Sequence, residues 1–309
     1  GGRTSDTTAW AVSLTRHGGS EVSVWKANSR GALVSAGIVD VHDSHDTTAL
    51  AIAPANARGF ALGCIDGAVR ICRGGFGGGA AVLPCEQVVA GATAPQSDAR
   101  IDAIAFSPSG TLLAFGNVGS SVFAAALSKS ASEAHDGQPR ELGRHSAGVT
   151  CISFVGEGEL VSGSEDGSIN MWDAQAGMRC GGHASAHAGI VTSIATLPSK
   201  HLIATGGPDG VLRTWDHRDW DAAATTSATG DCEPLRGVCF IDEWTLVSGS
   251  AFGLRLWDLR RMKTNIVAIP HAGVTTVAAA GSCVLVGNQD GCIDLYTAGW
   301  MARPSTRPW

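Results

Sequence analysis

Short apolar runs alternate with glycine-rich and polar turns along the chain, and this pattern predicts many short β-strands. In runs such as Val149–Phe154 and Leu202–Thr205, apolar and small residues occupy the positions that point to both faces of the expected strand. Tight-turn sequences separate such runs at 162–167 and 205–210. We therefore expect an all-β fold whose strands are packed on both faces.

The pattern repeats about every 42 residues. Three histidines in similar contexts mark the period, the second 42 residues after the first and the third 84 residues later: His145, His187 and His271. After each histidine comes an Asp-Gly turn, and an aromatic residue stands six positions beyond that Asp. Trp172 and Trp215 are 43 residues apart, and Trp257 follows after 42 more. A period of this length with four strands and a Trp-Asp ending is typical of one propeller blade.

These markers resemble the WD-repeat family over essentially the whole chain. The resemblance implies a seven-bladed WD-repeat β-propeller with four-stranded antiparallel blades, formed by residues 1–299, with residues 300–309 as a tail. Blades four to seven match well, whereas blades two and three are degenerate, and Cys72 replaces the tryptophan of blade two. Blade one is incomplete, because Gly1–Thr8 is too polar and short for an innermost strand. An upstream segment, the Trp300–Trp309 tail or a partner chain would have to supply that strand.

The resemblance also implies a buried hydrogen-bonded tetrad in each regular blade. In such a set the Asp accepts from the His, the His bonds a hydroxyl, and the hydroxyl accepts from the indole N–H. Blades four and five would contribute His145, Ser162, Asp166 and Trp172, and His187, Thr205, Asp209 and Trp215.

A His, Ser and Asp set also fits a hydrolase triad, but a set that recurs in several blades is better explained as structure. Gly74–Ala80 is rich in glycine but precedes a strand-like run instead of a helix, so we interpret it as a connection and not a phosphate loop. His42–Asp46 has residue types that bind metals, yet its position favours a turn. We therefore predict no catalytic site, no cofactor and no metal.

Charge and cysteine content narrow the class of partner. The net charge is −6 without any run of Lys or Arg, which argues against direct nucleic-acid binding. No apolar run reaches the length of a membrane-spanning helix. The nine cysteines form no C-x-x-C pair, and most lie in apolar runs, so we expect buried free thiols in a reducing compartment. These features favour a cytoplasmic or nuclear protein that binds other proteins.

The face that carries the turns before each marker Asp is the expected partner site, since family members commonly bind partners there. The turn residues are small or weakly charged: Ile65, Glu165, Pro208, Ala251 and Gln289. Such residues suit an extended peptide or a neighbouring subunit better than phosphate. Trp220, in a polar setting, is the best candidate for an exposed aromatic anchor.

Two Trp-Asp-x-Arg endings leave a second function open. They place Arg218 and Arg260 where some WD-repeat proteins dock to the adaptor of cullin-type ubiquitin ligases. The main hypothesis is a non-catalytic scaffold subunit of a larger assembly, such as a ribonucleoprotein, nuclear-pore or ciliary complex. The alternative is a substrate receptor of a ubiquitin ligase.

Overall fold

The structure is a computed structural model, and it describes residues 10–15, 21–27, 33–40, 47–54, 59–73, 85–89, 98–127, 138–220, 225–228, 233–261, 265–280 and 283–297. The strands of these residues form seven antiparallel sheets, here numbered in chain order. In every sheet, strands that are consecutive in the sequence lie side by side. The all-β, antiparallel fold predicted from the sequence is therefore confirmed.

The strand bounds are as follows. Sheets 1 and 2 comprise β1 (Trp10–Thr15), β2 (Glu21–Ala27) and β3 (Leu33–Asp40), then β4 (Thr47–Ile52), β5 (Gly59–Cys64), β6 (Val69–Arg73) and β7 (Cys85–Val89). Sheets 3 and 4 comprise β8 (Ile101–Phe106), β9 (Leu112–Asn117), β10 (Ser121–Ala126) and β11 (Arg140–Arg144), then β12 (Val149–Phe154), β13 (Glu159–Ser164), β14 (Ile169–Asp173) and β15 (Met178–His183). Sheets 5 and 6 comprise β16 (Ser193–Leu197), β17 (Leu202–Gly206), β18 (Val211–Asp216) and β19 (Thr225–Ala228), then β20 (Leu235–Phe240), β21 (Thr245–Ser250), β22 (Gly253–Asp258) and β23 (Asn265–Pro270). Sheet 7 comprises β24 (Val274–Ala280), β25 (Cys283–Asn288) and β26 (Ile293–Thr297).

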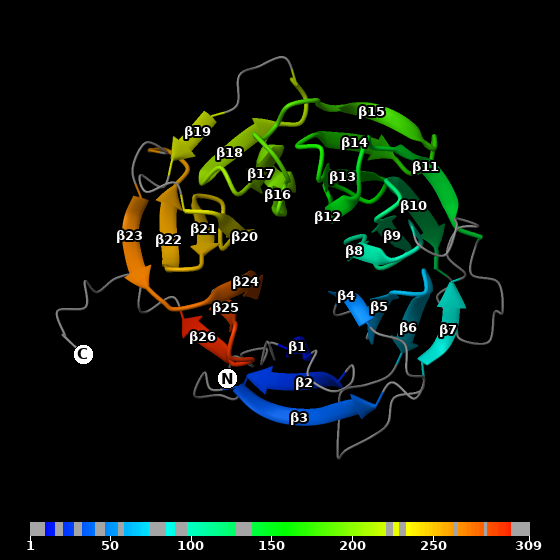
Figure 1. Cartoon of the computed structure of the whole chain (residues 1–309), viewed down its shortest axis with the longest axis horizontal. Coiled ribbons are helices and arrows are strands. Elements are labelled where there is room, and N and C mark those ends of the chain that lie inside the picture. The colour runs from blue at the N-terminus through cyan, green and yellow to red at the C-terminus, as the bar shows by residue number, and fades with distance from the viewer. Residues whose placement is uncertain are drawn as a thin grey trace, which may run out of the picture.

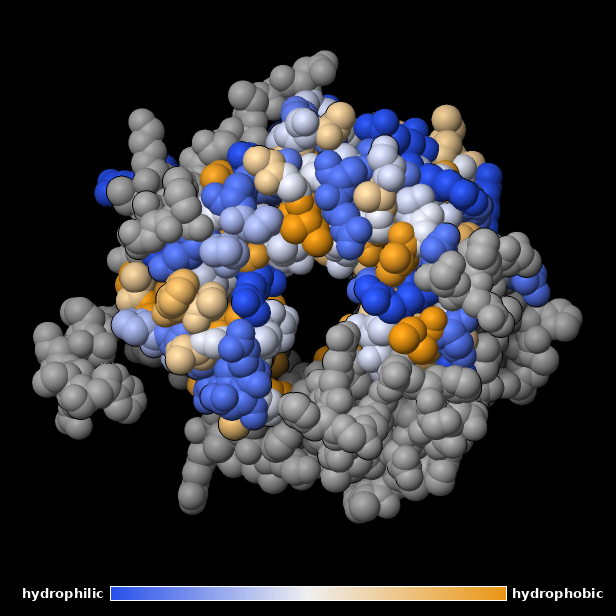
Figure 2. Space-filling view, in the orientation of Figure 1, coloured by the Kyte–Doolittle hydropathy of each residue, from blue (hydrophilic) through white to orange (hydrophobic). Residues whose placement is uncertain are grey.

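The sheets stand in a ring around a central opening, like the blades of a propeller (Figure 1). In sheets 2 to 7 the first strand lies nearest the centre and the last lies at the rim (Figure 1). The opening is also visible in the space-filling view, where hydrophobic side chains are scattered over the exposed face (Figure 2). Sheets 2 to 6 have the four strands that we expected, whereas sheets 1 and 7 each have three among the described residues.

The hydrophobic core is divided into layers between neighbouring sheets. Five clusters of buried side chains join sheets 2 and 3, 3 and 4, 4 and 5, 5 and 6, and 6 and 7. Trp172, for example, packs with Leu142 of the preceding sheet, and Trp257 packs with Ala204 of its own preceding sheet. Burying a large apolar side chain contributes about 1.5–3 kcal/mol, so each layer holds two sheets together.

A glycine in the second strand of each regular sheet lets the next sheet approach closely. A Cβ atom at Gly163 would lie 2.7 Å from Cγ1 of Val191, the residue that leads into the inner strand of sheet 5. Only a residue without a side chain leaves room for this packing. The same relation links five pairs: Gly63 with Ile101, Gly116 with Val149, Gly163 with Val191, Gly206 with Leu235, and Gly249 with Val274.

Candidate functional site

The tetrad of sheet 5 has the connections that the resemblance implied. Trp215 Nε1 donates to Thr205 Oγ1 over 3.0 Å, and the same hydroxyl lies 2.9 Å from His187 Nε2. His187 Nδ1 lies 3.0 Å from Oδ1 of Asp209, which also accepts from Arg213 Nη1 over 2.7 Å at its other oxygen. These bonds are mutually satisfied when the imidazole is neutral with its proton on Nδ1. These hydrogen bonds therefore link the segment before inner strand β16, which carries His187, to β17 and to the third strand, β18.

Electrostatics in this set follow from burial and from the neighbouring charges. Burial lowers the pKa of His187 and outweighs the opposing effect of Asp209, so the ring stays neutral near pH 7. Burial alone would raise the pKa of Asp209, but hydrogen bonds from Arg213 and His187 lower it. The carboxylate is thus ionised and paired with a cation.

Sheet 4 differs from this arrangement at one bond. His145 Nε2 and Trp172 Nε1 each lie 2.7 Å from Ser162 Oγ, as expected. Nδ1 of His145, however, lies 2.7 Å from the hydroxyl of Ser168 and 4.0 Å from the carboxylate of Asp166. Asp166 instead accepts from the backbone N–H groups of Ser146 and Ser168. The expected His–Asp bond is therefore replaced here, because the Ser168 hydroxyl occupies the space between the two side chains.

Sheets 6 and 7 keep only parts of the set. In sheet 6 Trp257 Nε1 donates to Ser248 Oγ over 2.8 Å, and Glu233, two residues before inner strand β20, pairs with Arg255 at 3.5 Å. In sheet 7 His271 Nε2 lies 2.8 Å from Asp294, a residue of β26, and not beside the turn Asp. The residue two positions before the aromatic residue of the third strand, Arg255 or Asp294, thus carries the charged partner in both sheets, and the sequence analysis missed this position.

These polar sets cannot serve as hydrolase triads. The imidazoles of His145 and His187 have no exposed surface, and both nitrogens of each ring are occupied by neighbours inside the sheet. Each hydroxyl accepts an indole N–H, which places a tryptophan where a substrate carbonyl would need to lie. Among the residues that the structure describes, no group of three or more His, Cys, Asp or Glu side chains could hold a metal ion. Both Gly74–Ala80 and His42–Asp46 lie outside those residues.

The five predicted turn residues lie at the same end of their sheets, between the second and third strands. Glu165 and Gln289 are exposed, and Ile65 is 47% exposed. Pro208 and Ala251 are half-buried. The backbone ties two of these turns to the entry of an inner strand, since Glu165 N donates to Gly148 O over 2.9 Å and Gln289 N donates to Gly273 O over 2.8 Å. We call this surface the turn face.

Two other aromatic residues are more exposed than the predicted anchor. Trp220 is half-buried, packs beside Trp215 at a ring distance of 6.5 Å, and fits where Gly181 leaves space, so it is not an exposed anchor. Phe252 is 68% exposed on the turn face, at the position where other sheets have the marker Asp. Trp244 is 47% exposed at the opposite end of its sheet, with Lys200 Nζ over its ring. Sequence analysis missed Phe252, although an aromatic residue inside a turn is a signal that could have identified it as an exposed side chain.

The two Trp-Asp-x-Arg arginines are exposed and fold back on their own motifs. Arg218 forms two bonds to Asp216, of 2.9 and 2.6 Å, and Arg260 forms the same pair with Asp258, of 2.8 and 2.7 Å. The guanidinium groups hold the pKa of Asp258 at about 2 and that of Asp216 well below its usual range. Docking to a ligase adaptor through these arginines stays a prediction.

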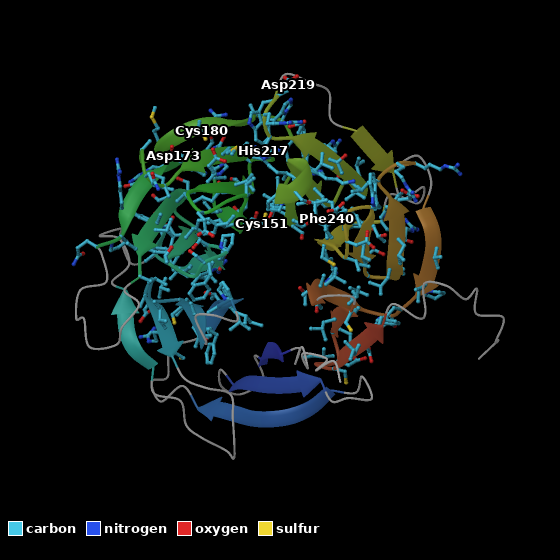
Figure 3. All side chains as sticks on the ribbon, turned by 180° about the vertical axis from the view of Figure 1, so that it is seen from behind. Cys151, Asp173, Cys180, His217, Asp219 and Phe240 are labelled. Carbon is cyan, nitrogen blue, oxygen red and sulfur yellow. The ribbon has the colours of Figure 1, made fainter. Side chains whose placement is uncertain are left out.

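The cysteines correct one expectation. Cys72 is disulfide-bonded, and the register of β6 and β7 places Cys85 opposite it, so the nine cysteines are not all free thiols. Burial raises the pKa of Cys151 to about 12, which makes it unreactive, and that residue lies on inner strand β12 (Figure 3). Cys180, on rim strand β15, is exposed (Figure 3). Burial also raises the pKa of Cys64, Cys180 and Cys239, so these three thiols lack the lowered pKa of a nucleophile.

Two stretches of the chain match the sequence profile of the family described as WD domain, G-beta repeat, at residues 138–173 and 178–216. These two stretches are WD repeats. Each of them begins with the rim strand of one sheet and ends with the third strand of the next, from β11 to β14 and from β15 to β18. One sequence repeat therefore belongs to two neighbouring sheets and links them covalently.

Similar proteins carry several different names. The LEC14B protein of Lithospermum erythrorhizon is 33% identical over 141 residues, which are 42% of this chain and 29% of that protein. The p21-activated protein kinase-interacting protein 1-like of Gallus gallus is 40% identical over 73 residues, 24% of this chain and 20% of the relative. WD repeat-containing protein 55 of Rattus norvegicus is 26% identical over 224 residues, 68% of this chain and 55% of the relative. The chain thus spans less than two thirds of the length of each relative.

Proposed function

We propose that this WD-repeat protein is a non-catalytic scaffold that holds proteins together within a larger assembly, with its seven sheets as the blades of one propeller. The observation that carries the proposal is the division of polar groups. Side chains of catalytic type, such as His187 and Thr205, are enclosed in the sheets, whereas Glu165, Gln289 and Phe252 are exposed together on the turn face. A rigid ring with exposed turns offers a binding surface and no reactive centre.

The charge arrangement supports proteins as partners in preference to nucleic acids. Seven arginines of the described residues each lie within 3.5 Å of a carboxylate: Arg70, Arg100, Arg144, Arg213, Arg218, Arg255 and Arg260. Phosphate contacts would have to displace these carboxylates, and the net charge of −6 opposes the approach of a polyanion. The word kinase-interacting in one relative's name agrees with a role in protein binding.

We place the protein in the cytoplasm or nucleus, as a subunit of a ribonucleoprotein, nuclear-pore or ciliary assembly. No helix of the described residues is long and apolar enough to cross a membrane. Free thiols at the buried Cys64 and Cys239 and at the half-buried Cys151 agree with a reducing compartment, whereas the disulfide at Cys72 does not follow from it.

The test is affinity purification of the tagged chain from cells at mild salt, with identification of the proteins that co-purify. A turn-face variant, Ile65→Asp with Glu165→Arg and Gln289→Arg, should lose stoichiometric partners. A matched variant at the opposite end of the sheets, Gln175→Arg with Glu243→Arg, should retain them. A wild-type chain that purifies without any stoichiometric protein would contradict the proposal.

A further inference from the structure

Two histidines meet at the end of sheet 5 that lies opposite the turn face, and we call them the histidine pair. His201 directly precedes β17, and His217 directly follows β18 (Figure 3). The register of these strands pairs Leu202 with Asp216, so the two histidines stand opposite each other. The backbone N–H of His217 donates to the carbonyl of His201 over 3.0 Å, and His201 Nδ1 lies 3.3 Å from His217 Nε2. Each imidazole therefore presents one nitrogen to the other.

The local backbone fixes the position of this pair. His201 ends a single turn of 3-10 helix, Pro198–Lys200, and its N–H donates to the carbonyl of Pro198 over 3.2 Å. With φ of 58° and ψ of 28°, His201 has a left-handed conformation, which sets the direction in which its side chain leaves the chain. His201 is exposed and His217 is half-buried. The pair is therefore held by the fold and accessible to solvent.

The cations next to the histidine pair in the sequence contact other groups. Lys200 Nζ lies over the ring of Trp244, 2.7 Å from its centroid. Arg218 forms its two bonds to Asp216, of 2.9 and 2.6 Å. Among the described residues, no third His, Cys, Asp or Glu side chain completes a metal-binding group with the pair. A cation bound by the pair would therefore have two protein ligands, with water at its other positions.

The distances between the two rings fit a shared metal ion better than a straight hydrogen bond. Two imidazoles bound to one tetrahedral Zn²⁺ at about 2.0–2.1 Å have nitrogens about 3.3 Å apart and ring centroids about 5.2 Å apart. The corresponding distances of the histidine pair are 3.3 Å and 5.2 Å. A straight N–H···N bond of the same length would place the centroids about 5.6 Å apart. The two nitrogens therefore point toward a common position beside the pair.

The ligand type and the angle at this position select the ion. Imidazole binds Zn²⁺, Cu²⁺ and Ni²⁺, whereas Mg²⁺ and Ca²⁺ take oxygen ligands. Cu²⁺ and Ni²⁺ favour square-planar or tetragonal sites, in which neighbouring nitrogens about 2.0 Å from the metal lie about 2.8 Å apart. The wider separation of 3.3 Å fits the tetrahedral angle of Zn²⁺.

We propose that His201 and His217 bind one Zn²⁺ ion, through Nδ1 and Nε2 respectively, with water at its remaining positions. Binding requires that neither of these nitrogens carries a proton, so each neutral ring keeps its proton on the other nitrogen. Two bonds to the metal then replace the contact between the rings. The ion ties the start of β17 to the end of β18, and the site does not depend on the scaffold function.

Calorimetric titration of the metal-free full chain with Zn²⁺ at pH 7.5 tests the site. The chain has ten histidines and nine cysteines, so the readout is the difference between variants. Loss of an outer-shell partner already costs about tenfold or more in metal affinity, so His201→Gln and His217→Gln should each cost at least that at one site. His183→Gln is the matched control and should bind as the wild type does, because His183 lies at the turn-face end of β15.

Thermal unfolding of the same four proteins gives a second readout. Zn²⁺ should raise the Tm of the wild type and of His183→Gln, because a ligand that binds the folded chain stabilises it, and should raise that of the two pair variants less. The comparison is between each protein with and without Zn²⁺, so a pair variant that is less stable from the start still tests the site. Mg²⁺ should cause no such difference. Equal Zn²⁺ affinities and equal Tm shifts in all four proteins would overturn the proposal.

Discussion

Val191 packs directly on Gly163, with the Cγ1 atom of the valine 2.7 Å from the place that a Cβ of residue 163 would take. The two residues belong to neighbouring sheets, and Sγ of Cys151 lies 2.8 Å from the same Cβ position. A single added methyl group therefore has no space between the sheets.

Gly163→Ala should destabilise the protein by about 1–3 kcal/mol, because overpacking forces the two sheets apart. Urea unfolding followed by tryptophan fluorescence measures the change. Gly156→Ala, where no atom lies within 4 Å, should leave the midpoint nearly unchanged. Equal midpoints for the two variants would show that the contact is not tight in solution.

Ser162→Ala should cost more stability than Ser248→Ala. Ser162 bonds both His145 and Trp172, so its loss leaves two buried groups without a partner, whereas Trp257 is the one side chain that Ser248 bonds among the described residues. Each unsatisfied buried group costs about 1–3 kcal/mol. The free energies of unfolding of the two variants, measured by denaturant titration at pH 7.5, should differ by one such amount. A larger loss for Ser248→Ala would contradict this assignment.

Stability should fall as the pH drops from about 6.5 to about 4, before most carboxylates are protonated. Burial lowers the pKa of His145 to about 4 from 6.5, so in this range the unfolded chain binds a proton that the folded protein excludes. The contribution is fully present above pH 6.5 and is lost as pH falls through this window, by about 3 kcal/mol for this one residue. His187, whose pKa burial also lowers, adds to the effect. Unfolding curves at pH 7 and pH 5 for the wild type and His145→Asn test this, and the variant should show the smaller difference.

A rim contact between sheets 3 and 4 predicts a coupled pair of mutations. Arg140 of β11 donates to the carbonyls of Gln175 and Ala176 over 2.9 and 2.7 Å, and Gly177 follows with φ of 68° and no room for a Cβ beside the guanidinium. Gly177→Ala should destabilise the protein by more than the roughly 1–2 kcal/mol that a left-handed backbone alone costs. In an Arg140→Ala background only the backbone cost should remain, and a double-mutant cycle measures the difference. Additive effects would exclude the steric contact.

The repeat and the tetrad residues could be predicted from the sequence because they depend on residue type and spacing. The contact of Ser168 with His145 could not be predicted. Its hydroxyl takes the place of a direct bond between His145 and Asp166, and residue types alone do not show which of the two His145 Nδ1 will contact. The charged partners Arg213 and Asp294 were missed because the third strand alternates, and nothing in the pattern marks which polar side chain turns inward. Trp220 was predicted to be exposed from its acidic neighbours, but Gly181 of the preceding sheet leaves a place for its ring.

The disulfide at Cys72 also could not be predicted from the sequence. Sequence spacing predicted free thiols, since Cys72 and Cys85 are separated by a glycine-rich segment and form no short motif. In the structure, the register of β6 and β7 places the backbone of Cys85 opposite that of Cys72. Register depends on the paired strand and not on local sequence alone, so it became visible only in the fold.

The second-strand glycines also impose an order along the chain, because each of them is covered by a residue of the sheet that follows in the sequence. A ribosome delivers the amino-terminal blades first. Gly163 is therefore synthesised 28 residues before Val191, which packs on it, and the other four pairs are separated by 25 to 38 residues. Each newly made blade keeps an open apolar seam until its successor emerges, so this protein should depend most on chaperones during its synthesis and least once the ring is complete.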